Sequence, residues 1–246
     1  HPPTERALRE RGLSYRPVSI ELAEGVSCVT GANMGGKTVS MKLAGLVAAM
    51  AGHGLFVPCD AAALGLSSSI AILIGDGQDA GKGLSSFGSE MDGLNVMLSE
   101  SSAGALLLID EIAGATNPAE GRALTKGIIA YLSDKPYITL ITTHFDHVAD
   151  GAGVVNYRVR GLSGANFGEL TDALTDAGPD ERLKAIAELM DYRLERVSAE
   201  RETPRDAIRI AEILGITKEI LDLARSFIGA EAPPGPERNR NEQTES

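Results

Sequence analysis

The stretch Gly31-Ala32-Asn33-Met34-Gly35-Gly36-Lys37-Thr38 decides the fold. A glycine, four further residues and then Gly-Lys-Thr is the spacing of a phosphate-binding loop. An apolar run at 26–30 precedes it, and an apolar helical pattern from about Lys37 to Met50 follows it. The loop is therefore expected to join a strand to a helix whose N-terminal N–H groups converge on phosphate oxygens. The simpler alternative is a glycine-rich turn ahead of a core helix.

Two side chains at the end of this loop carry its chemistry. Lys37 would neutralise the β- and γ-phosphates of ATP, and the hydroxyl of Thr38 would coordinate Mg²⁺. We therefore predict ATP and Mg²⁺ as the ligands of the loop.

A pair of acids follows the apolar run Leu106–Ile109. At the carboxyl end of a buried parallel strand, Asp110 can hold Mg²⁺, directly or through water. Glu111 can polarise the attacking water as a general base. The alternative is that both acids cap the following helix.

A third polar group, Thr142-Thr143-His144, ends another apolar run. His144 could donate a hydrogen bond to the γ-phosphate and so close the site only when ATP is bound. The alternative is a strand-end histidine that caps a helix. A metal site formed by His144 and His147 is less favoured, because no third ligand is evident nearby.

The alternation of short apolar runs with helical patterns predicts an α/β fold, a mostly parallel mixed sheet flanked by helices. Strands are expected at 26–30, 69–75, 105–111, 137–144 and 154–160, and helices at 179–190, 203–215 and 217–228. The chain divides into an N-terminal extension at 1–17, which we interpret as a remnant of an upstream region, and a P-loop ATPase core at 18–178. A C-terminal helical dimerisation segment at 179–230 and a disordered polar, proline-rich tail at 231–246 follow.

Composition narrows the class of protein. The apolar run from Leu43 to Val57 is too short to span a bilayer and is interrupted by Gly52 and Gly54, so no membrane segment is expected. Cys28 and Cys59 form no CxxC pair, which suits a reducing cytoplasm. The net charge of −11 opposes non-specific attraction to nucleic acid, so any DNA contact would come from a local basic patch or from upstream residues. The chain begins with His1 rather than Met, which suggested a fragment.

With these three elements in order, the sequence resembles the ATPase domain of the MutS family, a P-loop NTPase of ABC type. TGANMGGKT (30–38) resembles the family's TGPNMGGKS/T, and DEIAGATNPAEG (110–121) resembles its strand-end acids and the following loop. TLITTHFDHV (139–148) is similar to its histidine switch, and IGDGQDAGKGLSSFGSEM (74–91) to its signature segment. The likeness runs from about Val18 to His147.

The details look more like the second, non-mismatch-correcting branch of the family and its small MutS-like proteins. Thr38-Val39, the IGDGQ segment and TTHF carry this likeness, and YRL (192–194) with the segment 203–224 is similar to that branch's closing region. The small nuclease domain and the clamp, lever and mismatch-reading domains have no counterpart here.

The resemblance implies further site residues. Ser85 matches the signature serine that reaches the γ-phosphate of ATP held by the opposite subunit, so the site requires a homodimer or a heterodimer with a related subunit. Ser85 and Ser86 could instead be an N-cap pair. Gln78 is placed near Mg²⁺ or the attacking water, Tyr15 against adenine, and Val39 beside the nucleotide.

The sequence is compatible with two functions. In the first, ATP binding closes a two-subunit site and hydrolysis opens it, which moves a clamp on mismatched or branched DNA. In the second, the chain is an ATP-dependent remodelling or reactivating factor for a protein client such as a cobalamin-dependent amino-acid aminomutase. A nucleotide-gated module that hardly turns over is disfavoured by Glu111.

Overall fold

The computed structural model describes residues 2–10, 15–31, 36–75, 86–151, 153–162, 174, 177–197 and 206–230. Two units are distinguished by their internal contacts. The larger comprises 1–165 with 184–206, and the smaller comprises 166–183 with 207–246. Each is considered by itself below. No helix within the described ranges is both long and apolar enough to cross a membrane.

The larger unit is built on a six-stranded sheet in the described residues, with the order β2-β3-β4-β1-β5-β6. Its strands are β1 (Gly25–Thr30), β2 (Ile70–Ile74), β3 (Leu106–Asp110), β4 (Ile138–Thr143), β5 (Val155–Gly161) and β6 (Asp191–Val197). The first five run parallel to one another, and β6 pairs antiparallel with β5. The predicted mixed, mostly parallel α/β sheet is confirmed.

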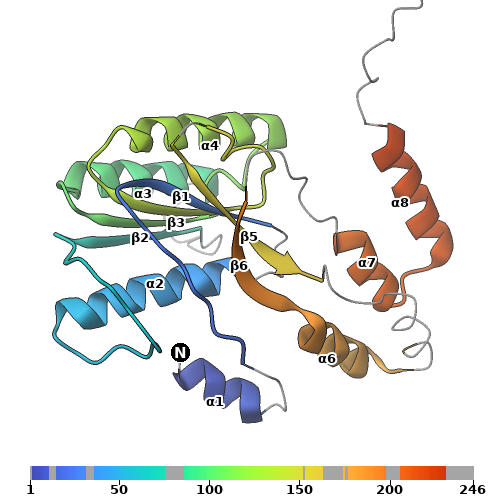
Figure 1. The fold of residues 1–246 in the computed structure, drawn as a ribbon. Helices are drawn as coiled ribbons and strands as arrows, with labels where there is room; N and C mark the ends of the chain where they lie inside the picture. Colours follow the sequence, from blue (N-terminus) through green and yellow to red (C-terminus); the bar gives the residue numbers. More distant parts are fainter. Residues whose placement is uncertain are drawn as a thin grey trace, which may run out of the picture. The chain divides into compact units, whose positions relative to one another are not determined.

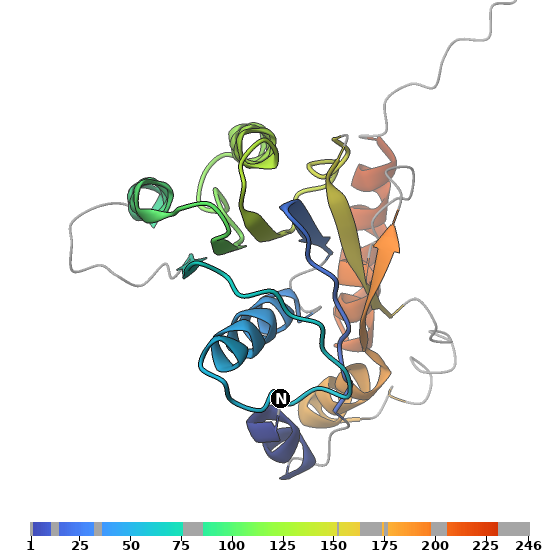
Figure 2. The same ribbon diagram turned by 60° about the vertical axis from the view of Figure 1, so that its left-hand side comes forward.

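Helices cover both faces of this sheet (Figures 1 and 2). The helix α2 (Lys37–Gly52) lies on one face, while α3 (Ser86–Glu100) and α4 (Pro118–Ser133) lie side by side on the other. Asn117 begins α4, because its side chain accepts a hydrogen bond from the Ala119 amide at 2.9 Å and a proline follows it. The remaining helix confined to this unit is α1 (Pro2–Glu10).

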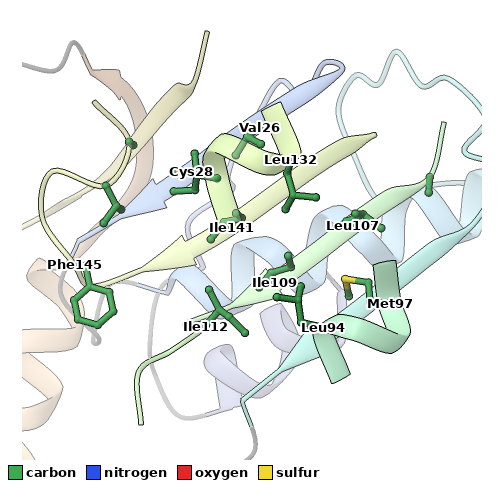
Figure 3. Packing of buried hydrophobic residues seen from close by; sticks show 14 residues of the cluster. Val26, Cys28, Leu94, Met97, Leu107, Ile109, Ile112, Leu132, Ile141 and Phe145 are labelled. Atoms are coloured by element: carbon green, nitrogen blue, oxygen red, sulfur yellow. The ribbon is translucent and has the colours of Figure 1, made fainter. Parts of the chain in front are cut away.

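The central strands are apolar on both sides, so each face of the sheet has its own core. Leu107 and Ile109 of β3 pack with Leu94 and Met97 of α3 on the face that α4 also covers (Figure 3). Leu106 and Leu108, which alternate with them, pack instead with Met41 of α2. Strand β3 is therefore fixed from both sides, and its last residue, Asp110, is held in place by a rigid element.

The strand β6 corrects one expectation. Residues 179–230 were expected to form a helical segment, yet Asp191–Val197 extend the sheet beside β5. The pairing is supported by an ion pair of 2.6 Å between Arg158 of β5 and Glu195 of β6. Both side chains are largely buried, which favours this partner strand over a solvent-exposed helix.

The smaller unit contains α7 (Asp206–Ile213) and α8 (Lys218–Ala230). The predicted end of the first helix at Gly215 is confirmed. Gly215 has a φ of 86°, and the Ile216 amide donates to the Ala211 carbonyl while the Gly215 amide donates to Glu212. This pattern is a Schellman motif, which needs a residue without a Cβ at this position. The expected start of this helix at Thr203 lies outside the described residues, as does the tail at 231–246. Helix α6 (Pro179–Leu189) confirms the helix expected at 179–190.

Gly121 allows helix α4 to pack closely against Ala113 and Phe145. A Cβ on Gly121 would lie 2.6 Å from the Ala113 carbonyl oxygen and 2.8 Å from Cζ of Phe145. The Gly121→Ala variant is therefore expected to lose about 1–3 kcal/mol of unfolding free energy, as overpacked cores do. Gly127→Ala, on the same helix with open space around it, should instead gain about 0.5–1 kcal/mol from helix propensity. Urea denaturation of both variants measures the contrast, and equal stabilities would refute the tight approach at Gly121.

Candidate functional site

Three neighbouring strands bring the predicted site residues to one edge of the sheet. The register aligns Thr30 of β1 with Thr143 of β4, and Asp110 of β3 with Thr142 of β4. All three strands run parallel, so the residues that follow them emerge together at the carboxyl edge. This edge is where open α/β sheets bind their ligands.

Asp110 and Thr38 face each other at this edge. The Thr38 hydroxyl lies 3.0 and 2.9 Å from the two carboxylate oxygens of Asp110, and the Thr142 hydroxyl also donates to Oδ1. Asp110 is 7% exposed. A buried carboxylate beside a hydroxyl offers the hard oxygen donors that Mg²⁺ prefers, so these two residues fit the predicted ion.

Lys37 is a buried cation at the first turn of α2, with 2% exposure. Its Nζ donates to the Gly31 carbonyl at 2.7 Å and lies 3.2 Å from Oε1 of Glu111. A buried ammonium needs such partners, since an uncompensated one is costly. The lysine therefore joins the two ends of the predicted phosphate loop to the acid that follows β3.

Glu111 occupies an unusual backbone conformation, with a φ of 48°. Its amide donates to the Thr142 carbonyl at 3.0 Å, which ties the residue to β4. Its side chain is 31% exposed. A non-glycine residue in the left-handed region stores strain, which is most often found at functional sites. In this conformation the Glu111 carboxylate lies beside the Lys37 ammonium.

His144 lies on the other side of Glu111. Its Nδ1 is 3.8 Å from Oε2 of Glu111, and its ring packs on Phe145 with the ring centroids 4.4 Å apart. The imidazole is 37% exposed, so a ligand at the carboxyl edge can reach it. The structure therefore places a carboxylate, an imidazole and an ammonium around one point.

The sequence that forms the carboxyl edge of the sheet identifies the protein family. A family model for MutS domain V matches residues 27–167, which include all of these residues. The chain belongs to the MutS family.

Several curated relatives share this MutS region. The chain is 32% identical over 234 residues to an endonuclease MutS2 of Thermomicrobium roseum, covering 93% of this chain and 27% of the relative. It is 33% identical to an endonuclease MutS2 of Pelotomaculum thermopropionicum, covering 87% of this chain and 25% of the relative. A DNA mismatch repair protein MutS of Roseiflexus is 33% identical over 61% of this chain and 14% of its own length. The chain thus spans about a quarter of the length of its MutS2 relatives.

The structure brings together some of the residues predicted from the MutS resemblance and leaves others apart. The residues gathered at the carboxyl edge are Gly31, Gly36, Lys37, Thr38, Asp110, Glu111 and His144. Ala32, Asn33, Met34, Gly35, Gln78 and Ser85 lie outside the described residues. Val39 is 56% exposed on α2. Burial raises the pKa of Tyr15, and the charges of Glu5 and Cys59 add to the rise.

The alternative metal role of His147 finds no support. His147 pairs with Asp150, with 2.9 Å between Nδ1 and Oδ2. Within the described ranges, no group of three or more His, Cys, Asp or Glu residues could hold a metal ion.

Sequence reasoning missed two residues of the MutS site. Tyr192 of β6 lies against the loop, since a Cβ on Gly36 would be 3.1 Å from its ring, and burial raises its pKa. Thr142 bridges both acids, because its hydroxyl donates to Asp110 and accepts from the Glu111 amide at 3.3 Å. The threonine was within a recognised motif, TTH, so its position was a usable signal. Tyr192 gave no such signal for a place in the site, because its contact with Gly36 depends on the unexpected strand β6.

Proposed function

We propose that this chain is an ABC-type P-loop ATPase domain that binds and hydrolyses MgATP at a site shared between two subunits. The observation that carries the proposal is the buried Lys37 ammonium, held between the Gly31 carbonyl and the Glu111 carboxylate. A buried lysine at a helix start, facing an acid at the end of a neighbouring strand, is the arrangement that phosphoryl transfer needs.

The residues at the carboxyl edge fit the parts of MgATP. The ammonium of Lys37 and the N-terminus of α2 would hold the phosphates. Gly36 has a φ of 73°, which residues with a Cβ rarely adopt, and a Cβ there would also meet the Tyr192 ring at 3.1 Å. The Thr38 hydroxyl and the Asp110 carboxylate would hold Mg²⁺, which supplies positive charge to the phosphate oxygens when it is bound. We infer that Tyr192 offers an aromatic ring beside the loop.

Hydrolysis follows from the position of Glu111. Phosphate oxygens compete with Glu111 for Lys37, so substrate binding frees the carboxylate. It then accepts a proton from a water molecule whose oxygen attacks the γ-phosphorus. The bond from the γ-phosphorus to the β–γ bridging oxygen breaks, and ADP leaves with that electron pair. His144 would donate a hydrogen bond to a γ-phosphate oxygen as charge develops there.

The shared site and the DNA target rest on likeness to other proteins. Ser85, in the segment similar to the MutS signature, would reach the γ-phosphate bound to a second subunit. The relatives named above are two endonucleases and a DNA mismatch repair protein. We therefore propose that ATP-driven opening and closing acts on mismatched or branched DNA.

The proposal is tested by measuring phosphate release from ATP. The protein is expected to hydrolyse ATP with Mg²⁺ and to lose that activity when EDTA removes the ion, while thermal unfolding without nucleotide stays unchanged. Added MgATP should raise the midpoint of unfolding, because a ligand that binds only the folded state stabilises it. Absence of both hydrolysis and a shift at millimolar MgATP would refute the proposal.

A further inference from the structure

The short turn that carries Glu111 contains a second residue in the left-handed region. Glu111–Gly114 is called the catalytic turn below. Glu111 and Ala113 have φ values of 48° and 60°, and the Gly114 amide donates to the Glu111 carbonyl at 3.1 Å. Neither Glu111 nor Ala113 is a glycine, so this strained backbone persists only where its surroundings hold it. Its amides therefore need partners that are fixed in space.

Glu90 of α3 provides one of these partners. Its Oε2 accepts a hydrogen bond from the Ala113 amide at 3.0 Å. Its Oε1 lies against the end of β2, where a Cβ on Gly75 would be 3.1 Å away. The same position on Gly75 would be 3.7 Å from the Asp110 carbonyl oxygen. The carboxylate thus lies between the end of β2 and the catalytic turn.

The surroundings of Glu90 are poorly solvated for an acid. Burial raises its pKa, and the hydrogen bond from Ala113 opposes that rise. A carboxylate kept in such a place is held there by its partner rather than by water. Helix α3 begins at Ser86, inside the segment 74–91 that resembles the MutS signature, and Glu90 lies in that segment. Glu90 therefore links the described end of that segment to the catalytic turn.

We propose that Glu90 is a positioning residue that holds the catalytic turn and couples it to the start of α3. The Glu90 carboxylate fixes the Ala113 amide, and this fixes the left-handed backbone that aims Glu111 at Lys37. A displacement of α3 toward or away from the sheet changes this hydrogen bond and hence the direction of the base. The proposal rests on the ATPase function proposed above.

Three variants test this role. Glu90→Gln keeps an oxygen that can accept from Ala113, whereas Glu90→Ala removes it. Asp92→Ala removes an exposed acid of the same helix and is the matched control. Glu90→Ala is expected to lower kcat about tenfold or more, in keeping with one lost hydrogen bond, with little change in KM for ATP. Glu90→Gln should recover most of the rate, and Asp92→Ala should equal the wild type.

Hydrogen exchange of the Ala113 amide provides a readout that does not depend on activity. Exchange should be faster in Glu90→Ala and near wild type in the other two variants. A kcat in Glu90→Ala equal to that of Asp92→Ala would overturn the proposal, and so would a lower kcat without faster exchange at Ala113. If the wild type hydrolyses no ATP, the proposed function fails. Unchanged Ala113 exchange in Glu90→Ala would then reject the structural role of Glu90 separately.

Discussion

Glu111→Gln is expected to lower ATP turnover by about 10²- to 10⁴-fold, the usual contribution of a general base. Glutamine has nearly the same shape but cannot take a proton from water. It also cannot form the ion pair in which Glu111 lies 3.2 Å from Lys37. Phosphate would then meet no competing carboxylate, so MgATP should bind as tightly as before or more tightly. The variant separates chemistry from binding.

Two measurements decide this prediction. Single-turnover hydrolysis reports the chemical step, and titration with a fluorescent ATP analogue reports affinity. Glu100→Gln, an exposed acid at the end of α3, is the control and should match the wild type in both. Turnover in Glu111→Gln within a factor of about two of the wild type would remove Glu111 from the role of base.

The sheet could be read from the sequence because its signals are local. Leu106–Ile109 are continuously apolar, as a strand covered on both faces must be, and the helix that starts at Lys37 begins where the glycine loop ends. The carboxyl ends of parallel strands meet at one edge, so placing Asp110 near Thr38 needed no coordinates. Their hydroxyl–carboxylate contact of about 3 Å is what that rule predicts.

The parts that could not be read depend on contacts between distant segments. The strand β6 is fixed by pairing with β5 and by the Arg158–Glu195 ion pair, and its own sequence, DYRLERV, is highly charged. Tyr192 reaches Gly36 only because that strand exists. The left-handed backbone of Glu111 is also imposed from outside, since its amide bonds to β4 and Ala113 bonds to Glu90. No residue in DEIAG (110–114) predicts this left-handed backbone.

Lys37→Ala is expected to weaken MgATP binding by about 10- to 100-fold, because it removes a charge-assisted contact to the phosphates. It also leaves Gly31 without the donor it has at 2.7 Å. The contact between Lys37 and Glu111 is not counted as a source of stability. The Glu111 side chain is 31% exposed, so water can solvate it once the lysine is gone. Lys42→Ala, an exposed lysine on the same helix, is the matched control and should bind MgATP normally.

The same variant tests whether the site is shared. If Ser85 acts on nucleotide held by the partner, Lys37→Ala and Ser85→Ala should each be nearly inactive alone, yet recover activity when mixed. An equal mixture should reach about a quarter of the wild-type rate, because half of randomly paired dimers are mixed and each mixed dimer holds one complete site. The rate of phosphate release from the mixture, after incubation long enough for subunits to exchange, gives the answer. Two outcomes would restrict the ATPase site to a single chain. One is an active Ser85→Ala variant, and the other is a mixture no faster than its parts once subunit exchange has been verified. Lys37, Asp110 and Glu111 would then have to act without a partner's serine.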